Sequence, residues 1–297
     1  DLIREAGYWA RKDGHSFVTR ADVESALAHQ RHRADLPEQW IQDEIREGTL
    51  MVALQGEVVG QVNGVSVYEL GDYAFGRPTR ITARTYVGTK GVIDIQREVE
   101  LAGNIHSKGV MTLAGFLAGK FAGMQPFALS ATLTFEQTYS EIEGDSAAVA
   151  ELTAVLSSLA DLPVRQSLAV TGSVNQLGEI QPIGGVNEKI EGFFESCKRR
   201  GLTGTQGVII PARNTKHLAL NREVVAAVEE GKFAVYGVDH VEQALELLIG
   251  VPAGERGPEG TFPPESIYGR TAARLEEMAQ IVANWGEGEE EPEKITG

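Results

Sequence analysis

The sequence of 297 residues lacks the features that mark several large classes of protein. It has one cysteine, Cys197, so no internal disulfide can form, which favours a reducing compartment such as the cytoplasm. Lys and Arg number 27 against 42 Asp and Glu, a net charge of −15, which argues against a nucleic-acid partner because binding needs a basic face. The best apolar run, residues 109–124, contains Lys120 and is too short to span a bilayer. We therefore expect neither nucleic-acid binding nor a membrane segment from these residues.

The chain also lacks the phosphate-binding loop Gly-x-x-x-x-Gly-Lys-[Ser/Thr]. The stretch ending at Gly119 and Lys120 comes nearest, but Ala114 stands at the first glycine position and Phe121 at the Ser/Thr position. We therefore expect no ATP binding, and no other cofactor or metal, in these residues. The chain opens within a helical pattern and without a methionine, so we expect it to be a fragment of a longer protein.

The distribution of residue types divides the chain into three parts. Residues 1–48 predict three short helices, the second capped by Thr19 and Asp22, and are too few to bury a core of their own. Residues 49–250 begin with strands rich in Val, Ile, Thr and Gly and continue with alternating helices and strands, typical of an α+β or α/β fold. Residues 251–297 predict a loop, a last helix and a solvated acidic tail. The expected elements of the alternating part are helices at 105–123, after 146, 187–200, 221–230 and 240–249, and strands at 127–135, 166–171, 207–210 and 233–236.

Ser146 stands in the stretch E-I-E-G-D-S-A-A-V, where an extended segment gives way to a helix. The apolar residues Val149, Leu152 and Val155 follow it at helical spacing, so Ser146 lies at or near the helix start. Either Ser146 or Asp145 can cap such a helix. Ser146 can also be a nucleophile, because the free N–H groups of a helix start can hold an oxyanion. The segment alone leaves both interpretations open.

A nucleophilic serine needs a residue that accepts its proton. The Gly-x-Ser-x-Gly elbow fails at Ala148, and the Gly-Asp-Ser-Gly-Gly pattern fails at Ala147 and Ala148. Of the six histidines only His106 is a plausible base, and its context does not mark it as one. Lys189, in Q-P-I-G-G-V-N-E-K, lies in the first turn of a helix, where burial and the helix dipole both disfavour the cation. A lysine in that turn breaks the usual charge pattern, which is typical of functional sites.

The segments E-G-D-S-A and V-T-G-S-V-N-Q-L-G-E-I-Q-P-I-G-G-V-N-E-K-I together resemble the proteolytic domain of Lon proteases. Within that family they are most similar to the Lon-B-type and Lon-related branches, in which Gly-Asp precedes the serine. The resemblance covers roughly residues 50–250, and residues 1–34 resemble the last helices of the small AAA+ subdomain. Residues past 251 resemble only the Lon-related branch. The resemblance implies a Lon-type α+β (α/β) domain with mixed sheets and packed helices, preceded by a short all-helical segment.

The resemblance also implies roles for single residues. Ser146 matches the family's nucleophile, Lys189 its general base, and Thr171 a threonine that supports the lysine amine by hydrogen bonding. The sequence departs from the family at Ala148, where related chains often carry serine or glycine. The other matching positions are the acidic residues flanking the nucleophile, Glu143 and Asp145, and the turn that presents the lysine helix, Gly184 and Gly185.

By this resemblance we expect a serine endopeptidase that hydrolyses unfolded or damaged proteins through a Ser146-Lys189 dyad and an acyl-enzyme intermediate. It implies a cytoplasmic homo-hexamer acting in protein quality control, with ATP bound only by a AAA+ module upstream of Asp1. The alternative is a non-catalytic Lon-like scaffold that serves oligomerisation. A scaffold has no need of either dyad residue, so the presence of both favours the peptidase.

Overall fold

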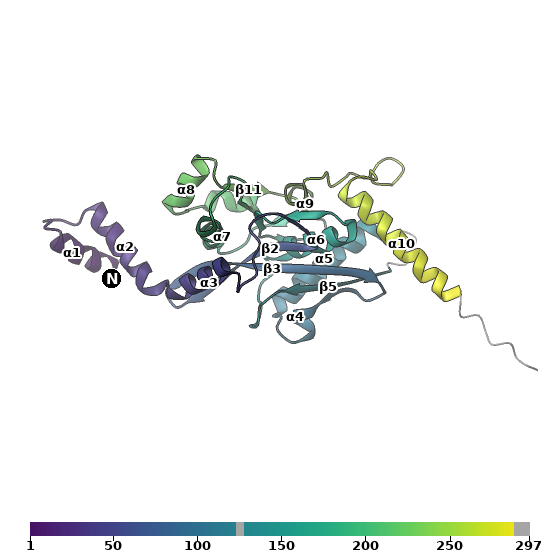
Figure 1. Ribbon diagram of the computed structural model, residues 1–297, viewed down its shortest axis with the longest axis horizontal. Helices are drawn as coiled ribbons and strands as arrows, with labels where there is room; N and C mark the ends of the chain where they lie inside the picture. The colour runs from purple at the N-terminus through teal and green to yellow at the C-terminus, as the bar shows by residue number, and fades with distance from the viewer. Residues whose placement is uncertain (123–127, 288–297) are drawn as a thin grey trace, which may run out of the picture.

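The computed structural model describes residues 1–122 and 128–287 (Figure 1). The ends of the predicted helix 105–123 and strand 127–135, and the acidic tail beyond Glu287, lie outside the described residues. Within the described part, no helix combines the length and the apolar character needed to cross a membrane.

The helices and strands follow the order that the sequence predicts, and the N-terminal helices show why. The Thr19 side chain accepts a hydrogen bond from the Asp22 N–H and the Asp22 side chain accepts one from the Thr19 N–H, which is the predicted capping box. The described helices are α1 (Leu2–Lys12), α2 (Arg20–Ala34), α3 (Leu36–Glu47), α4 (Ile95–Glu98), α5 (Asn104–Phe121), α6 (Ala148–Ala160), α7 (Val186–Arg200), α8 (Arg222–Glu229), α9 (Val241–Ile249), α10 (Ile267–Glu287) and the 3-10 helix η1 (Ala212–His217). The described strands are β1 (Glu57–Val59), β2 (Gln61–Leu70), β3 (Tyr73–Val87), β4 (Gly91–Asp94), β5 (Leu129–Phe135), β6 (Pro163–Arg165), β7 (Leu168–Val170), β8 (Ser173–Val174), β9 (Ile180–Gln181), β10 (Gly207–Pro211) and β11 (Ala234–Val238).

A seven-stranded mixed sheet forms the centre of the molecule, in the order β11-β10-β7-β2-β3-β5-β4. Strands β11, β10, β7 and β2 are mutually parallel, β3 is antiparallel to both β2 and β5, and β4 is parallel to β5. Strand β2 pairs with β3 from Gln61 to Leu70 but with β7 only at Asn63 and Gly64. Among the described strands, the remainder of β2 therefore has no partner on its β7 side. The mixed sheet and its covering helices confirm the predicted α+β (α/β) class.

Helices cover both faces of this sheet, and strand residues alternate between two hydrophobic clusters. In β10, Ile209 belongs to the cluster under α5, α6, α9 and α10, whereas Val208 and Ile210 belong to the cluster under α3 and α7. This alternation follows from the period of two along a strand. As a result, α6 and α7 lie on opposite faces of the sheet. Helix α3, from the predicted segment 1–48, adds the buried Ile45 to the α7 side.

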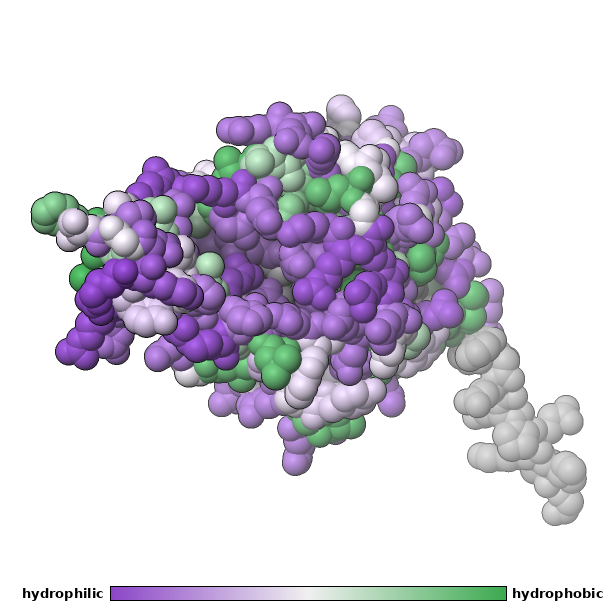
Figure 2. Space-filling view, turned by 60° about the vertical axis from the view of Figure 1, so that its left-hand side comes forward, coloured by the Kyte–Doolittle hydropathy of each residue, from purple (hydrophilic) through white to green (hydrophobic). Residues whose placement is uncertain are grey.

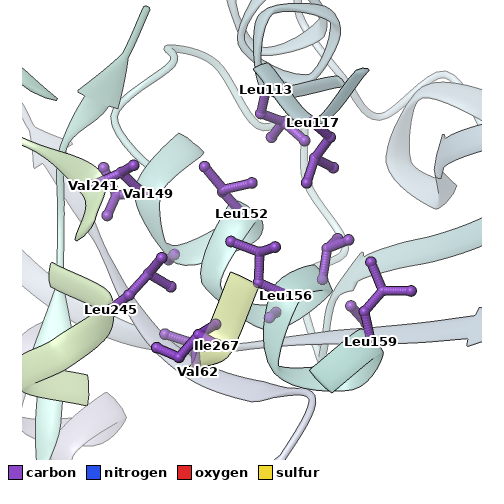
Figure 3. Close-up of a cluster of buried hydrophobic side chains, with 14 of the residues drawn as sticks. Val62, Leu113, Leu117, Val149, Leu152, Leu156, Leu159, Val241, Leu245 and Ile267 are labelled. Atoms are coloured by element: carbon purple, nitrogen blue, oxygen red, sulfur yellow. The ribbon is translucent and has the colours of Figure 1, made fainter. Parts of the chain in front are cut away.

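Helix α6 is the centre of the hydrophobic cluster that it forms with α5, α9 and α10 (Figure 3). Twelve of its thirteen residues are buried, which is typical of a helix covered on all sides rather than on one face. Part of that cover comes from the predicted C-terminal extension, because Ile267 and Met278 of α10 are fully buried in the same cluster. In Figure 1 α10 lies on the side of the molecule opposite the projecting helices α1 and α2.

The surface agrees with the acidic composition. The face shown in Figure 2 is mostly hydrophilic, with its apolar residues in small separate groups. The most exposed large apolar side chains, those of Phe17, Tyr139 and Leu177, belong to three different parts of the chain. Single exposed apolar side chains of this kind are normal on a water-facing surface.

Leu152 tests the central place of α6, because its side chain has no exposed surface. Replacing Leu152 with Ala should lower the free energy of unfolding by about 3 kcal/mol, the usual cost of a cavity in a rigid core. Leu177→Ala is the control, since that side chain is 79% exposed and its loss should change stability by less than about 0.5 kcal/mol. Urea unfolding of both variants measures the difference, and equal values would contradict the assignment of α6 to the core.

Candidate active site

Ser146 and Lys189 approach each other from opposite faces of the sheet. Ser146 precedes α6 and Lys189 lies in the first turn of α7, yet the Lys189 Nζ is 2.7 Å from the Ser146 Oγ. They meet where β7 ends at Val170, and the next residue, Thr171, places its Oγ1 3.0 Å from the same Nζ. Sites at the carboxyl ends of parallel strands are common, because helices from both faces begin there. The structure thus brings together three of the residues singled out in the sequence.

The backbone of Ser146 is held by the chain that follows β7. Its carbonyl oxygen accepts hydrogen bonds from the Gly172 N–H at 2.7 Å and from the Thr171 hydroxyl at 3.1 Å. Helix α6 begins after Ala147, and no side chain caps it. The interpretation of Ser146 or Asp145 as a side-chain cap is therefore wrong, and the Ser146 hydroxyl is instead engaged by Lys189.

The glycines before α7 fix where its first turn lies. Gly185 has a left-handed backbone with φ 64°, and a Cβ there would lie 2.6 Å from a methyl carbon of Val67 on β2. Only glycine satisfies both conditions without strain. The Gly185 carbonyl accepts the Lys189 N–H at 3.0 Å, and Gly184 lines the cleft beside the two side chains. The predicted turn thus stands directly before the lysine helix.

The surroundings of Lys189 favour its neutral form. Its side chain is buried, with 3% of its surface exposed, and this burial lowers the pKa of the amine to about 8. The charge of Asp145 acts in the opposite direction and keeps the pKa from falling further. With a pKa of about 8 the amine loses its proton as the pH rises from neutral to mildly alkaline, so the neutral form that accepts a proton becomes available in this range.

Two other residues considered from the sequence lie apart from this contact. Glu143 lines the cleft, but its Oε1 accepts a long hydrogen bond of 3.4 Å from the N–H of Ile105 in the first turn of α5. His106 is fully buried, with its Nε2 3.1 Å from Asp94 and 3.7 Å from Glu151. It is not among the residues that line the cleft. The structure therefore gives no support to His106 as the base.

A cleft of about 500 Å³ opens beside Ser146 and Lys189. Residues 64–69 of β2 line it together with residues 140–144. The sequence predicts strands in this part of β2 but does not connect them to the site. A sequence signal is present in the neighbouring strand β3, where Gly76 lies in the strand interior. A glycine at such a position is typical of close approach by another backbone. Within residues 1–122 and 128–287, no group of three or more His, Cys, Asp or Glu side chains is placed to hold a metal ion.

Comparison with known proteins identifies the family of the chain. Residues 140–250 match the family model of the Lon protease (S16) C-terminal proteolytic domain, and residues 1–33 match that of the archaeal LonB AAA+ ATPase lid domain. The fold is that of a Lon-type proteolytic domain, preceded by helices that match the end of a AAA+ lid. The chain belongs to the Lon protease family, in the branch that includes the LonB and Lon-related proteins.

Individual relatives support the same assignment. The chain is 52% identical over 211 residues to a putative Lon protease homolog of Escherichia coli, covering 70% of this chain and 36% of the relative. It is 44% identical over 246 residues to a putative Lon protease homolog of Haemophilus influenzae, covering 82% and 41%. An archaeal Lon protease of Thermococcus kodakarensis is 29% identical over 258 residues, covering 87% and 37%. The chain thus spans less than half the length of these relatives.

Burial of Lys189 predicts a measurable effect on stability. Below pH 8 the folded protein holds a buried cation, and a pKa lowered from 10.5 to about 8 corresponds to a cost of up to ~3 kcal/mol. Lys189→Met should therefore stabilise the protein at about pH 7. The gain should shrink as the pH rises from 8 toward 10.5, because the unfolded wild-type protein then also loses the lysine proton and the two states no longer differ in charge.

The matched control is Lys198→Met on the same helix, where the lysine side chain is 43% exposed. It should change the free energy of unfolding by less than about 0.5 kcal/mol. Urea unfolding at several pH values measures both variants. A Lys189→Met variant no more stable than the control at neutral pH would show that the lysine is not destabilised by burial.

Proposed function

We propose that this chain is the proteolytic part of a Lon-type serine endopeptidase, with Ser146 as nucleophile and Lys189 as general base. The observation that supports this most strongly is the 2.7 Å contact between the Lys189 Nζ and the Ser146 Oγ. A buried lysine whose pKa is lowered to about 8 can accept the hydroxyl proton at that distance. No histidine is needed in this arrangement.

In this reaction neutral Lys189 accepts the proton of Ser146, and the serine oxygen forms a bond to the carbonyl carbon of the substrate peptide. The peptide C–N bond then breaks, and the protonated lysine returns its proton to the leaving amine. Water then forms a bond to the acyl carbon while Lys189 accepts its proton. The bond between that carbon and the Ser146 oxygen breaks, the lysine returns the proton to Ser146, and the acid product leaves. Thr171, 3.0 Å from the amine, keeps the Nζ oriented toward Ser146.

The oxyanion of the tetrahedral intermediate needs hydrogen-bond donors beside Ser146. The N–H groups of Ala148 and Val149 already donate to the carbonyl oxygens of Asp145 and Gly172. This leaves the N–H groups of Ser146 and Ala147 as the proposed donors. Asp145 would stabilise the lysine cation formed in the reaction, since its charge raises the Lys189 pKa. Glu143 would act indirectly, by fixing the segment before Ser146 against α5.

The substrate is an extended polypeptide. The part of β2 that has no partner on its β7 side among the described strands lines the cleft next to the dyad. A free strand edge binds a peptide through backbone hydrogen bonds, which requires that the peptide's own backbone groups are unpaired. Unfolded or damaged proteins meet this requirement, whereas folded proteins do not.

The parent protein acts, in this proposal, as a homo-hexamer in the cytoplasm and in protein quality control. ATP would be bound only by a AAA+ module joined to α1, and the residues of this chain would need no cofactor. The match of residues 1–33 to a AAA+ lid supports that arrangement.

Ser146→Ala and Lys189→Ala should each lower cleavage of an unfolded, fluorescently labelled protein by at least about 10³-fold, since both groups act in the same step. The control is Lys198→Ala, on the same helix as Lys189 but with a side chain that is 43% exposed. It should keep a near wild-type rate. The wild-type rate should rise with pH through about 8, as Lys189 loses its proton. Undiminished cleavage by either dyad variant would overturn the proposal.

A further inference from the structure

Gln42 is a fully buried glutamine on α3 whose two amide atoms both contact the lysine helix. Its Nε2 donates to the Gly192 carbonyl at 3.2 Å, and its Oε1 accepts from the Ser196 hydroxyl at 2.7 Å. Gln42 and Ser196 are each 1% exposed. A buried amide with both ends satisfied fixes a single relative position of two helices, because any slip leaves polar groups unpaired. Apolar packing alone would not impose this restriction.

Gly192, one of the two residues that Gln42 contacts, is also close to β3. Gly192 lies one turn after Lys189, and a Cβ on it would come within 2.1 Å of the Gly76 carbonyl oxygen of β3. A Cβ on Gly76 would in turn lie 2.1 Å from the Glu188 carbonyl oxygen and 2.9 Å from the Lys189 Cα. The backbones of β3 and α7 therefore touch beside the lysine. Helix α7 is held between β3 and α3 at the turn that carries Lys189.

Helix α3 follows directly on the segment that matches the AAA+ lid, since Asp35 both ends α2 and precedes α3. By contrast, a cavity of about 580 Å³ separates α2 from α7 and the β2–β3 turn, with Leu27 of α2 on one side and Glu188 on the other. Arg31 of α2 acts on the Glu191 carboxylate of α7 through its charge, whereas the close-packed contacts with α7 are made by α3. A displacement of the lid would therefore reach α7 mainly through α3.

We propose that Gln42 is a positioning residue for Lys189: through it, α3 sets the axial position of α7 and hence the place of the amine beside Ser146. A movement of the helices that match the AAA+ lid would in this way change the position of Lys189, because α3 follows them directly. The catalytic meaning of this inference rests on the proposed function, but the position and protonation of Lys189 can be measured without any substrate.

The test compares Gln42→Leu with Gln39→Leu in the full chain. Gln39 is on the same helix and bonds only locally, to Asp35, so its variant controls for loss of an amide on α3. The Lys189 pKa is measured as the pH dependence of its reaction with acetic anhydride, mapped by mass spectrometry. Gln42→Leu should raise this pKa by about one unit from about 8, because a shifted α7 lets water reach the amine. Gln39→Leu should leave it unchanged.

Cleavage kinetics give the second readout. With an unfolded substrate, Gln42→Leu should lower kcat about tenfold while KM stays within about twofold, since a misplaced base slows chemistry without altering binding. Ser196→Ala removes one of the two contacts, so it should show the same changes more weakly. It serves as the test if Gln42→Leu does not fold.

One result would overturn the inference: an unchanged Lys189 pKa and kcat in a folded Gln42→Leu protein, or in Ser196→Ala when Gln42→Leu does not fold. A lower thermal midpoint beside that result would show that Gln42 only stabilises the fold. A wild-type chain whose cleavage matches that of Ser146→Ala would refute the proposed function instead, and the Lys189 titration would still decide the role of Gln42.

Discussion

The structure of this site depends on one costly arrangement, a lysine amine buried against a serine hydroxyl. Burial lowers the pKa of Lys189 to about 8, and the same burial destabilises the folded protein whenever the amine is protonated. The fold offsets this loss of stability with two hydrophobic clusters, one on each face of the sheet. It also supplies Thr171, which contacts the amine and holds the Ser146 carbonyl. The reactive contact is thus built where a strand ends and two core helices begin.

That arrangement favours the proposed peptidase over a scaffold of the same fold. A protein used only for oligomerisation would gain stability from an apolar residue at position 189, since burial of the lysine cation costs more than the nearby charge of Asp145 returns. The described hydrogen bonds give the Lys189 amine two partners, the hydroxyls of Ser146 and Thr171. Neutral acceptors of this kind suit an amine that exchanges protons better than one that only holds a charge.

Much of the fold could be predicted from local patterns, and the part that could not depends on long-range contacts. The capping box at Thr19 and the apolar spacing after Ser146 are local signals, and both helices begin within two residues of the expected position. The residues alone indicate Lys189 as a candidate base, but its pairing with Ser146 needed the family resemblance, because 43 residues and a sheet separate the two. The roles of Gln42 and Gly76 were not predicted. A glutamine reads as a surface residue until its partners are known, and a strand glycine signals a close approach without saying by what.

The most direct test of the central claim is reaction of the chain with a fluorophosphonate, which modifies a serine only when its oxygen is activated. The labelled residue is mapped by mass spectrometry across a pH series. We expect modification at Ser146, at a rate that rises as the pH passes about 8. In Lys189→Met we expect no modification of Ser146. Labelling of another serine, or of Ser146 at the same rate without Lys189, would contradict the dyad.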